Sequence, residues 1–314
     1  MTNLMKKIIA VSLLVISGSS MAWQPTRDVQ LVVPYGPGGG TDTIARIIAT
    51  AMNKAGSQIT VVNRPGASGL IGTKSVVNAN PDGHTLLLTG TAVMFSKVLA
   101  KPGSDYDLMK SFNHVALLGT VQTGVYQSTV AVDEPFATAM KNTLDGTRAY
   151  SWGVGNSTAE LIAQMIAGAS NNNIKIVRYQ GSTDARIDLI GGHIDFVIDA
   201  ALNSNEESMI QTGRVLKVAT VNKHAQDNTT LATLDQFIPG AISYSWFGIS
   251  LPAGTDPAIS EYYNRLIQTA LADPETQAKM AERSIDVDLA NTNFAQLIDQ
   301  DYKKYSKIYE HTNK

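Results

Sequence analysis

Two glycine-rich segments carry the pattern of residues with the clearest chemical potential. The first is Pro34-Tyr35-Gly36-Pro37-Gly38-Gly39-Gly40-Thr41-Asp42, and the second is Gly153-Val154-Gly155-Asn156-Ser157-Thr158. Glycine lets the backbone turn tightly and approach a ligand closely, and the first N–H groups of a helix attract an anion. Because each segment ends in residues typical of a helix start, the pattern predicts two loops that present helix N-termini to an anion.

Two further helices are expected to begin near Gly69 and Ser182. Ligands bind beyond the carboxyl ends of parallel strands, where loops enter helices. Four helix N-termini would therefore face one crevice. A single glycine loop is equally consistent with an ordinary strand-to-helix turn, but four together favour an anion site.

The first loop does not match the nucleotide-binding patterns. A phosphate-binding P-loop ends in Gly-Lys-Ser/Thr, whereas Gly40 is followed by Thr41 and Asp42. A dinucleotide fingerprint needs a third glycine or alanine and an acid at the end of the second strand, where this chain has Thr41 and Asn63. No nucleotide cofactor is expected, and a nucleotide-dependent enzyme is the least favoured function for this sequence.

Patterns for catalysis and metal binding are missing from the sequence. It contains no Gly-x-Ser-x-Gly elbow and no His-Glu-x-x-His helix, it has no cysteine, and its five histidines follow no recognised spacing. His84 and His193 precede strands at the end opposite the expected crevice. We therefore expect no catalytic residue, no metal site and no cofactor.

Three other side chains are candidates for the crevice. Asp199 lies near the carboxyl end of a strand, where it could orient a ligand amine or hydroxyl or cap the following helix. Trp246 and Phe247 could cover a ligand or pack within a hinge. The sequence leaves both pairs of alternatives open.

The elements that would position these loops alternate between strand and helix. Strands are expected at 31–33, 59–62 and 85–88, with helices between them, and the second half repeats the plan with strands at 149–152 and 174–177. The glycine spacing also repeats, with 28 positions in each half (66 − 38 and 181 − 153). Such alternation predicts α/β architecture with mainly parallel sheets flanked by helices. The spacing fits both a duplicated unit and two unrelated units of ordinary size.

The expected organisation is two lobes joined by two crossings. Strands at 215–221 and 242–249 and three closing helices are too few for a third sheet. The tail should therefore return to the first lobe. This assigns 23–122 plus 247–314 to lobe 1 and 123–246 to lobe 2, with crossings near 121–126 and 243–247.

The N-terminus has the layout of a cleavable secretory signal over residues 1–22. Lys6 and Lys7 precede an apolar run at 8–16, and Ser20-Met21-Ala22 precedes the expected cleavage before Trp23. No later stretch is long and apolar enough to cross a bilayer, so we expect a periplasmic monomer that is not embedded in a membrane. Removing the two signal lysines from the 25 basic residues leaves 23 against 27 acidic ones, a balance that does not favour nucleic-acid binding.

Several of these motifs together resemble one family. They are Val33-Pro34-Tyr35-Gly36-Pro37-Gly38-Gly39-Gly40-Thr41-Asp42, Asn63-Arg64-Pro65-Gly66, Pro81-Asp82-Gly83-His84 and Ser245-Trp246-Phe247-Gly248. The chain is similar to the Bug family, the tripartite tricarboxylate transporter receptors. The resemblance implies a two-lobed, type II (Venus-flytrap-like) periplasmic binding protein that captures a small organic carboxylate and delivers it to membrane transporter subunits. The alternative is a subunit that presents the ligand to a membrane sensor kinase.

The resemblance also implies which residues form two walls around the ligand. The first wall would hold the near carboxylate through Tyr35, Gly38, Gly39, Gly40, Thr41 and Asp42, completed by Ser68, Gly69, Thr89 and Gly90. The second wall would contain Gly153, Gly155, Asn156, Ser157, Thr158, Tyr179, Gly181, Ser182 and Asp199.

The second wall departs from the family pattern. Asn156-Ser157-Thr158-Ala159 and Val177-Arg178-Tyr179-Gln180-Gly181 replace the more usual runs, and this puts the particular substrate in doubt. Arg178 is a candidate partner for a distal carboxylate, since a guanidinium suits bidentate recognition.

Overall fold

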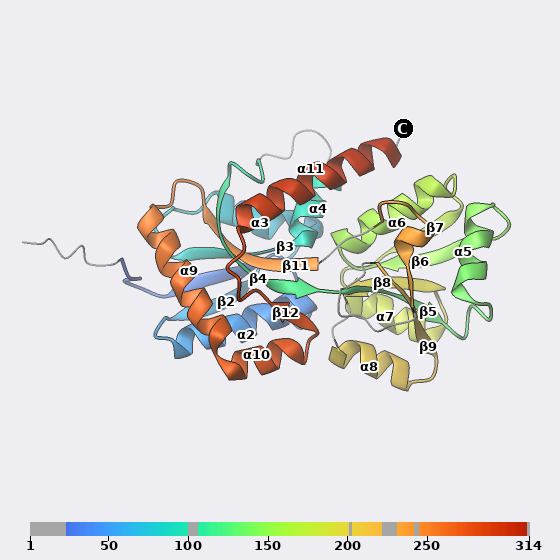
Figure 1. The fold of residues 1–314 in the computed structure, drawn as a ribbon, viewed down its shortest axis with the longest axis horizontal. Coiled ribbons are helices and arrows are strands. Elements are labelled where there is room, and N and C mark those ends of the chain that lie inside the picture. The colour runs from blue at the N-terminus through green and yellow to red at the C-terminus, as the bar shows by residue number, and fades with distance from the viewer. Residues whose placement is uncertain (1–22, 100–105, 201–202, 222–230, 242–244, 313–314) are drawn as a thin grey trace, which may run out of the picture.

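The structure, a computed structural model, describes residues 23–99, 106–200, 203–221, 231–241 and 245–312 of the chain. The expected signal segment 1–22 lies outside the described residues. Within them the chain forms two six-stranded sheets, each flanked by helices, that lie side by side in Figure 1. We call each sheet with its helices a lobe.

The first lobe is built on a mixed sheet with the strand order β12-β4-β11-β3-β1-β2. Strands β1, β2 and β3 run parallel, whereas β11 is antiparallel to both β3 and β4. The six strands are β1 (Val29–Val33), β2 (Ile59–Asn63), β3 (Thr85–Gly90), β4 (Phe112–Val121), β11 (Ser245–Pro252) and β12 (Ile285–Val287).

The second lobe repeats this arrangement in the order β10-β9-β5-β8-β6-β7. Its strands are β5 (Thr123–Ser128), β6 (Tyr150–Val154), β7 (Ile174–Arg178), β8 (Phe196–Ala200), β9 (Val215–Thr220) and β10 (Ala232–Thr233). In each sheet one strand arrives from the other lobe and pairs antiparallel with both of its neighbours. Strand β11 lies between β3 and β4, and β5 lies between β8 and β9. The α/β two-lobed fold class predicted from the sequence is confirmed.

The helices cover the sheets through amphipathic faces. In α2, for example, Ile44, Ile48 and Met52 repeat every four residues and are fully buried. The first lobe carries α2 (Gly40–Lys54), η1 (Ala67–Gly69), α3 (Leu70–Val77), α4 (Thr91–Leu99), α9 (Pro257–Ala272), α10 (Pro274–Ala281) and α11 (Phe294–Thr312). The second carries α5 (Phe136–Leu144), α6 (Ser157–Ala169), α7 (Ser182–Gly191), α8 (Asn203–Gln211) and η2 (Leu234–Gln236).

The two lobes pack against each other along α4, α6 and α11. One hydrophobic cluster runs through both of them, and it includes Phe95 of α4, Tyr305 of α11 and Leu161 of α6. The Phe95 and Tyr305 rings meet edge to face, with their centroids 4.8 Å apart. Figure 1 shows α11 extending from the first lobe toward α6 of the second. Apolar packing therefore holds the lobes together on this side of the molecule.

The chain passes directly from one sheet to the other between β4, which ends at Val121, and β5, which begins at Thr123. It is back in the first sheet from Ser245 onward. The exact lobe boundaries, 23–122 plus 247–314 and 123–246, stay a prediction.

Strand β4 is absent from the sequence prediction because Asn113 and His114 interrupt its apolar pattern. In the structure Asn113 donates to the Thr255 carbonyl and His114 is bonded to Ser250 Oγ.

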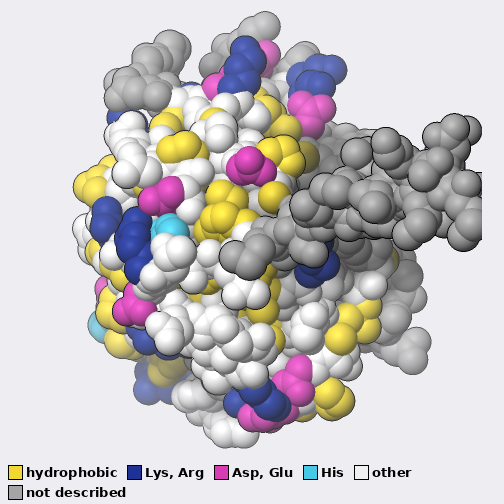
Figure 2. All heavy atoms as spheres, turned by 90° about the vertical axis from the view of Figure 1, so that its left-hand side faces the viewer, with side chains coloured by type: hydrophobic (Ala, Val, Ile, Leu, Met, Phe, Trp, Pro, Cys, Tyr) yellow, Lys and Arg dark blue, Asp and Glu magenta, His cyan; other side chains and the backbone are white. Residues whose placement is uncertain are grey.

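The described residues at the outer end of the first lobe show no concentration of one charge. On the face in Figure 2, basic and acidic side chains are interspersed. No helix among the described residues is long and apolar enough to span a membrane.

Candidate functional site

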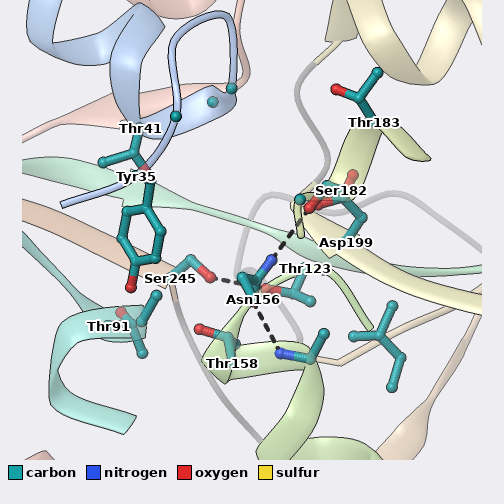
Figure 3. Close-up of a pocket in the computed structure, with 18 of the residues that line it drawn as sticks. Tyr35, Thr41, Thr91, Thr123, Asn156, Thr158, Ser182, Thr183, Asp199 and Ser245 are labelled. Atoms are coloured by element: carbon teal, nitrogen blue, oxygen red, sulfur yellow. Dashed lines mark hydrogen bonds between the residues drawn. The ribbon is translucent and has the colours of Figure 1, made fainter. Parts of the chain in front are cut away.

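A cavity of about 290 Å³ lies between the lobes, at the ends of strands from both sheets. The residues in Figure 3 reach it from the loop before α2 and from the starts of α4, α6 and α7. Its lining from the first lobe comprises Tyr35, Gly36, Pro37, Gly39, Gly40, Thr41, Thr91, Ala92, Ser245, Trp246 and Phe247. Its lining from the second lobe comprises Thr123, Gly155, Asn156, Thr158, Ala159, Gln180, Gly181, Ser182, Thr183, Asp184, Arg186, Ile198 and Asp199.

The glycine loop of the first wall is held from behind by Asp42. The buried Asp42 carboxylate accepts the Gly38 N–H at 2.9 Å and a two-pronged contact from Arg46 at 2.9 and 3.1 Å. It also accepts the Asn63 amide at 2.9 Å. Gly38 has a φ of 78°, which favours glycine. Burial alone would raise the pKa of Asp42, but the bonds from Arg46, Gly38 and Asn63 hold it below the ordinary value.

Asp42 therefore supports the loop and does not line the cavity, contrary to the sequence prediction of a ligand contact. The residues that do face the cavity are Gly39, Gly40 and Thr41. Gly39 is the N-cap of α2 and supplies no side-chain hydrogen bond to the helix. The first-turn N–H groups of α2 are thus left for a ligand in the cavity.

Tyr35 crosses from the first wall toward α6. Figure 3 shows its ring pointing to the region between Thr91 and Thr158. Its hydroxyl lies beside that of Ser157, and neither has a partner of normal hydrogen-bond geometry among the described residues. Burial raises the pKa of Tyr35, so its hydroxyl remains a donor. A Cβ on Gly69 would come within 3.0 Å of this hydroxyl, so Gly69 makes room for Tyr35 and does not line the cavity.

The second wall consists of two loops locked together. Asn156 caps α6 by accepting the Ala159 N–H at 3.0 Å, and its amide donates to Ser182 Oγ at 3.3 Å, as Figure 3 shows. A Cβ on Gly155 would lie 2.4 Å from the Ser182 nitrogen. Only glycine therefore allows the loop before α6 to pack this closely on the loop before α7. Gly181, the N-cap of α7, again offers no side-chain cap.

The far end of the second wall carries an ion pair. Arg186 Nη1 lies 2.6 Å from Asp199 Oδ2, and the two side chains are only 12% and 6% exposed. Arg186 Nη2 also donates to Thr183 Oγ1 at 3.2 Å. Asp199 is thus in the cavity as the sequence suggested. Arg186 is missed by sequence reasoning because its position inside α7 resembles that of any helix-surface arginine.

Arg178 lies elsewhere. Its guanidinium donates to Glu160 at 2.6 Å, and its side chain is 62% exposed. It does not line the cavity. The structure therefore does not bring Arg178 to the cavity, and among the described residues of this lobe the cation that lines it is Arg186.

The two crossing strands meet at the floor of the cavity. The Thr123 and Ser245 hydroxyls, one from each crossing, are 3.0 Å apart. Trp246 and Phe247 line the cavity, and the Trp246 indole N–H is anchored to Asp301 of α11 at 2.8 Å. The Trp246 backbone N–H donates to Thr91 Oγ1 at 2.7 Å. The hinge region is therefore part of the site.

The structure divides the predicted site residues into two groups. Those that line the cavity are Tyr35, Gly39, Gly40, Thr41, Gly155, Asn156, Thr158, Gly181, Ser182 and Asp199. Those that lie outside the lining are Gly38, Asp42, Ser68, Gly69, Thr89, Gly90, Gly153, Ser157 and Tyr179.

Several residues of the second group contact residues that do not line the cavity. Thr89 donates to Ser250 Oγ, and Tyr179 donates to Asp188. A Cβ on Gly153 would lie 2.5 Å from Ile194. Thr91, which does line the cavity, comes directly after the predicted Gly90. The sequence thus located the end of β3 at the cavity, but it did not identify Thr91 as the residue that lines it.

Comparison with known proteins agrees with this architecture. A family model described as the tripartite tricarboxylate transporter family receptor matches residues 44–314. The chain belongs to this family. It is 30% identical to the protein BugT of Bordetella pertussis over 253 residues, which is 79% of this chain and 77% of BugT.

Two solved structures share the fold of this chain. The periplasmic binding protein BugD superposes with a TM-score of 0.81 at 25% identity, covering 92% of this chain and 99% of BugD. The MatC protein of Rhodopseudomonas palustris, solved with bound malate, gives a TM-score of 0.80 at 22% identity, with 91% of this chain and 100% of MatC covered. The chain is a solute-binding receptor of this family.

Proposed function

We propose that the chain binds a small organic carboxylate in the cavity between its lobes and delivers it to the membrane subunits of a tripartite tricarboxylate-type transporter. The observation that carries this proposal is the start of α2. Its first-turn N–H groups, with no side-chain cap, open onto a cavity through Gly39, Gly40 and Thr41. The positive end of a helix dipole and free N–H donors suit an anion.

The same wall favours a carboxylate over a phosphate. The first wall contributes N–H groups and the hydroxyls of Tyr35, Thr41 and Thr91, but no cationic side chain faces the cavity from it among the described residues. The anionic Asp42 also lies directly behind the loop. A phosphate dianion is typically matched by arginine or lysine, whereas a single carboxylate charge can be held by oriented dipoles.

Ligand binding would stabilise the closed arrangement of the two lobes. The cavity is lined from both lobes, so a ligand that contacts both walls binds the closed form better than an open form. Such differential affinity shifts the population toward closure. The membrane subunits would then recognise the closed shape, and no covalent step is involved.

Family membership and the likeness to a periplasmic binding protein support a periplasmic location. We place the receptor in the periplasm as a monomer after removal of residues 1–22. MatC, a structural neighbour, was solved with malate bound, so small hydroxylated and dicarboxylic acids belong among the first compounds to test.

Thermal unfolding with a ligand panel tests the proposal. Residues 23–314 would be heated alone, with C3 to C6 carboxylates and with nucleotides. A ligand at about 100 times its dissociation constant adds roughly 2.7 kcal/mol to the stability, which raises the midpoint by several degrees. A shift with one or more carboxylates and none with nucleotides is expected. The opposite result, or no shift with any carboxylate, would overturn the proposal.

A further inference from the structure

The far end of the cavity differs from the near end because it contains charged side chains. Arg186 and Asp199 form their 2.6 Å ion pair in the cavity lining with little exposure. Asp184, at the start of α7, also lines the cavity and is exposed. Among the residues that the structure describes, this end of the lining therefore offers one cation and two anions.

Behind the lining, Lys217 does not supply an extra positive charge to this end of the cavity. Lys217 of β9 is bound to Glu206 of α8 at 2.9 Å, and both side chains are largely buried. Burial raises the pKa of the nearby Tyr126 hydroxyl, and the Glu206 and Asp199 carboxylates raise it further. Each of the two cations named here is thus already matched by a carboxylate, and Asp184 adds a further negative charge.

We propose that the Arg186–Asp199 pair selects carboxylates whose other end carries a hydrogen-bond donor, a hydroxyl or an ammonium group, and disfavours a second carboxylate. The inference rests on the proposed function, since it assumes that the near carboxylate binds at the start of α2. Asp199 is the acceptor for the donor group. A carboxylate has about four lone-pair sites, so Asp199 can accept a ligand donor in addition to Arg186 and its other contacts.

Arg186 has a positioning role in this selection. It holds the Asp199 carboxylate in one orientation, and Thr183 fixes its other guanidinium nitrogen. Its bonds to Asp199 and Thr183 use one proton on each terminal nitrogen, so N–H donors remain for a ligand hydroxyl oxygen. A hydroxyl could then donate to Asp199 and accept from Arg186, whereas a second carboxylate would stand beside two like charges.

Titration calorimetry of residues 23–314 with matched ligands tests the selection. The probes are straight-chain carboxylic acids of four, five and six carbons. At each length the end opposite the carboxylate carries no substituent (plain acid), a hydroxyl group (ω-hydroxy acid), an amino group (ω-amino acid) or a second carboxylate (diacid). At the chain length that binds best, a donor-ended acid should bind about tenfold or more tightly than both the plain acid and the diacid, since hydrogen bonds to charged groups are worth about 1.5–3 kcal/mol. The hydroxy and amino arms identify the donor.

Asp199→Asn supplies the residue-level test, because it keeps the shape and removes the charge. It should weaken the binding of the ω-amino acid by about tenfold or more. It should also raise the affinity for the diacid to that for the donor-ended acids or above it. Arg178→Gln is the matched control, since it breaks another arginine–carboxylate pair of the same lobe outside the cavity. This control should leave the ranking unchanged.

The outcomes separate the two proposals. A diacid that binds wild type as tightly as its hydroxy and amino counterparts overturns the inference and leaves the carboxylate receptor standing. An unchanged ranking in Asp199→Asn also overturns it. The absence of binding by every carboxylate would instead overturn the proposed function. The wild-type ranking decides the matter even if the variant does not fold.

Discussion

The two walls of the cavity follow one plan but stabilise their loops differently. In the first wall, Asp42 holds the glycine loop from behind and the start of α2 has no side-chain cap. In the second wall, Asn156 caps α6 and the two loops interlock at Gly155, while Arg186 and Asp199 place charges in the lining. The first wall is therefore suited to a general anionic group, and the second to discriminating among the groups at the other end.

Matched substitutions at Gly39 and Gly181 give the largest expected effect. Both residues line the cavity at N-cap positions, and their φ values of −77° and −169° suit any residue. A Cβ on Gly39 would have its nearest neighbour at 3.7 Å, and one on Gly181 would have none within 4 Å. Gly39→Val should reduce the affinity for every carboxylate by about 100-fold or more, because its side chain obstructs the α2 N–H groups. Each hydrogen bond to a charged group is worth about 1.5–3 kcal/mol.

Gly181→Val should instead change the relative affinities of different carboxylates, because it alters the wall that contacts the distal group. Calorimetric titration with the same panel would measure both variants. Unliganded thermal unfolding serves as the control, since neither valine strains the backbone. Equal losses of affinity for all carboxylates in both variants would mean that the two walls do not have different roles in binding.

A second comparison concerns the ion pairs that support each wall. Asp42→Asn weakens the bonds to Arg46 and Gly38, so it should cost about 2–3 kcal/mol of unfolding free energy, as expected for bonds involving a buried charge. It should also weaken binding of all carboxylates in proportion. Glu160→Gln breaks the exposed Arg178 pair of the second lobe and should cost less than about 1 kcal/mol.

Urea denaturation of both variants would measure these costs. The pKa of Asp42 lies below its ordinary value, so its contribution is present above the unfolded pKa and is lost as the pH falls through the folded pKa. The difference between the two variants should therefore shrink in acid. Equal costs at neutral pH would contradict the supporting role of Asp42.

The first lobe should also respond to mild acid through His114. Burial lowers the pKa of His114 to about 4, despite its bond to the Leu108 carbonyl. The unfolded chain takes up this proton near pH 6.5 and the folded chain does not, so stability should fall by about 1–2 kcal/mol between pH 7 and pH 5. His114→Gln should flatten this part of the profile measured by urea denaturation. An unchanged slope would show that other groups cause the loss.

The sequence was sufficient for the fold class and for the loops that reach the cavity, because glycines and helix starts are local signals. It placed Asp42 at the start of α2, but it could not show that the carboxylate turns back toward Arg46 and Asn63. Arg186 could not be found, since only the packing of α7 against β8 brings it to Asp199. Side-chain direction and contacts between distant elements account for these differences.

The crystal structure of residues 23–314 with the carboxylate that gives the largest thermal shift would test the division between the walls most directly. We predict that the ligand lies in the cavity with its carboxylate within hydrogen-bond distance of the N–H groups at Gly40 and Thr41, and with its other end toward Asp199. A carboxylate bound only by the second wall, or a ligand bound outside the cavity, would contradict this account.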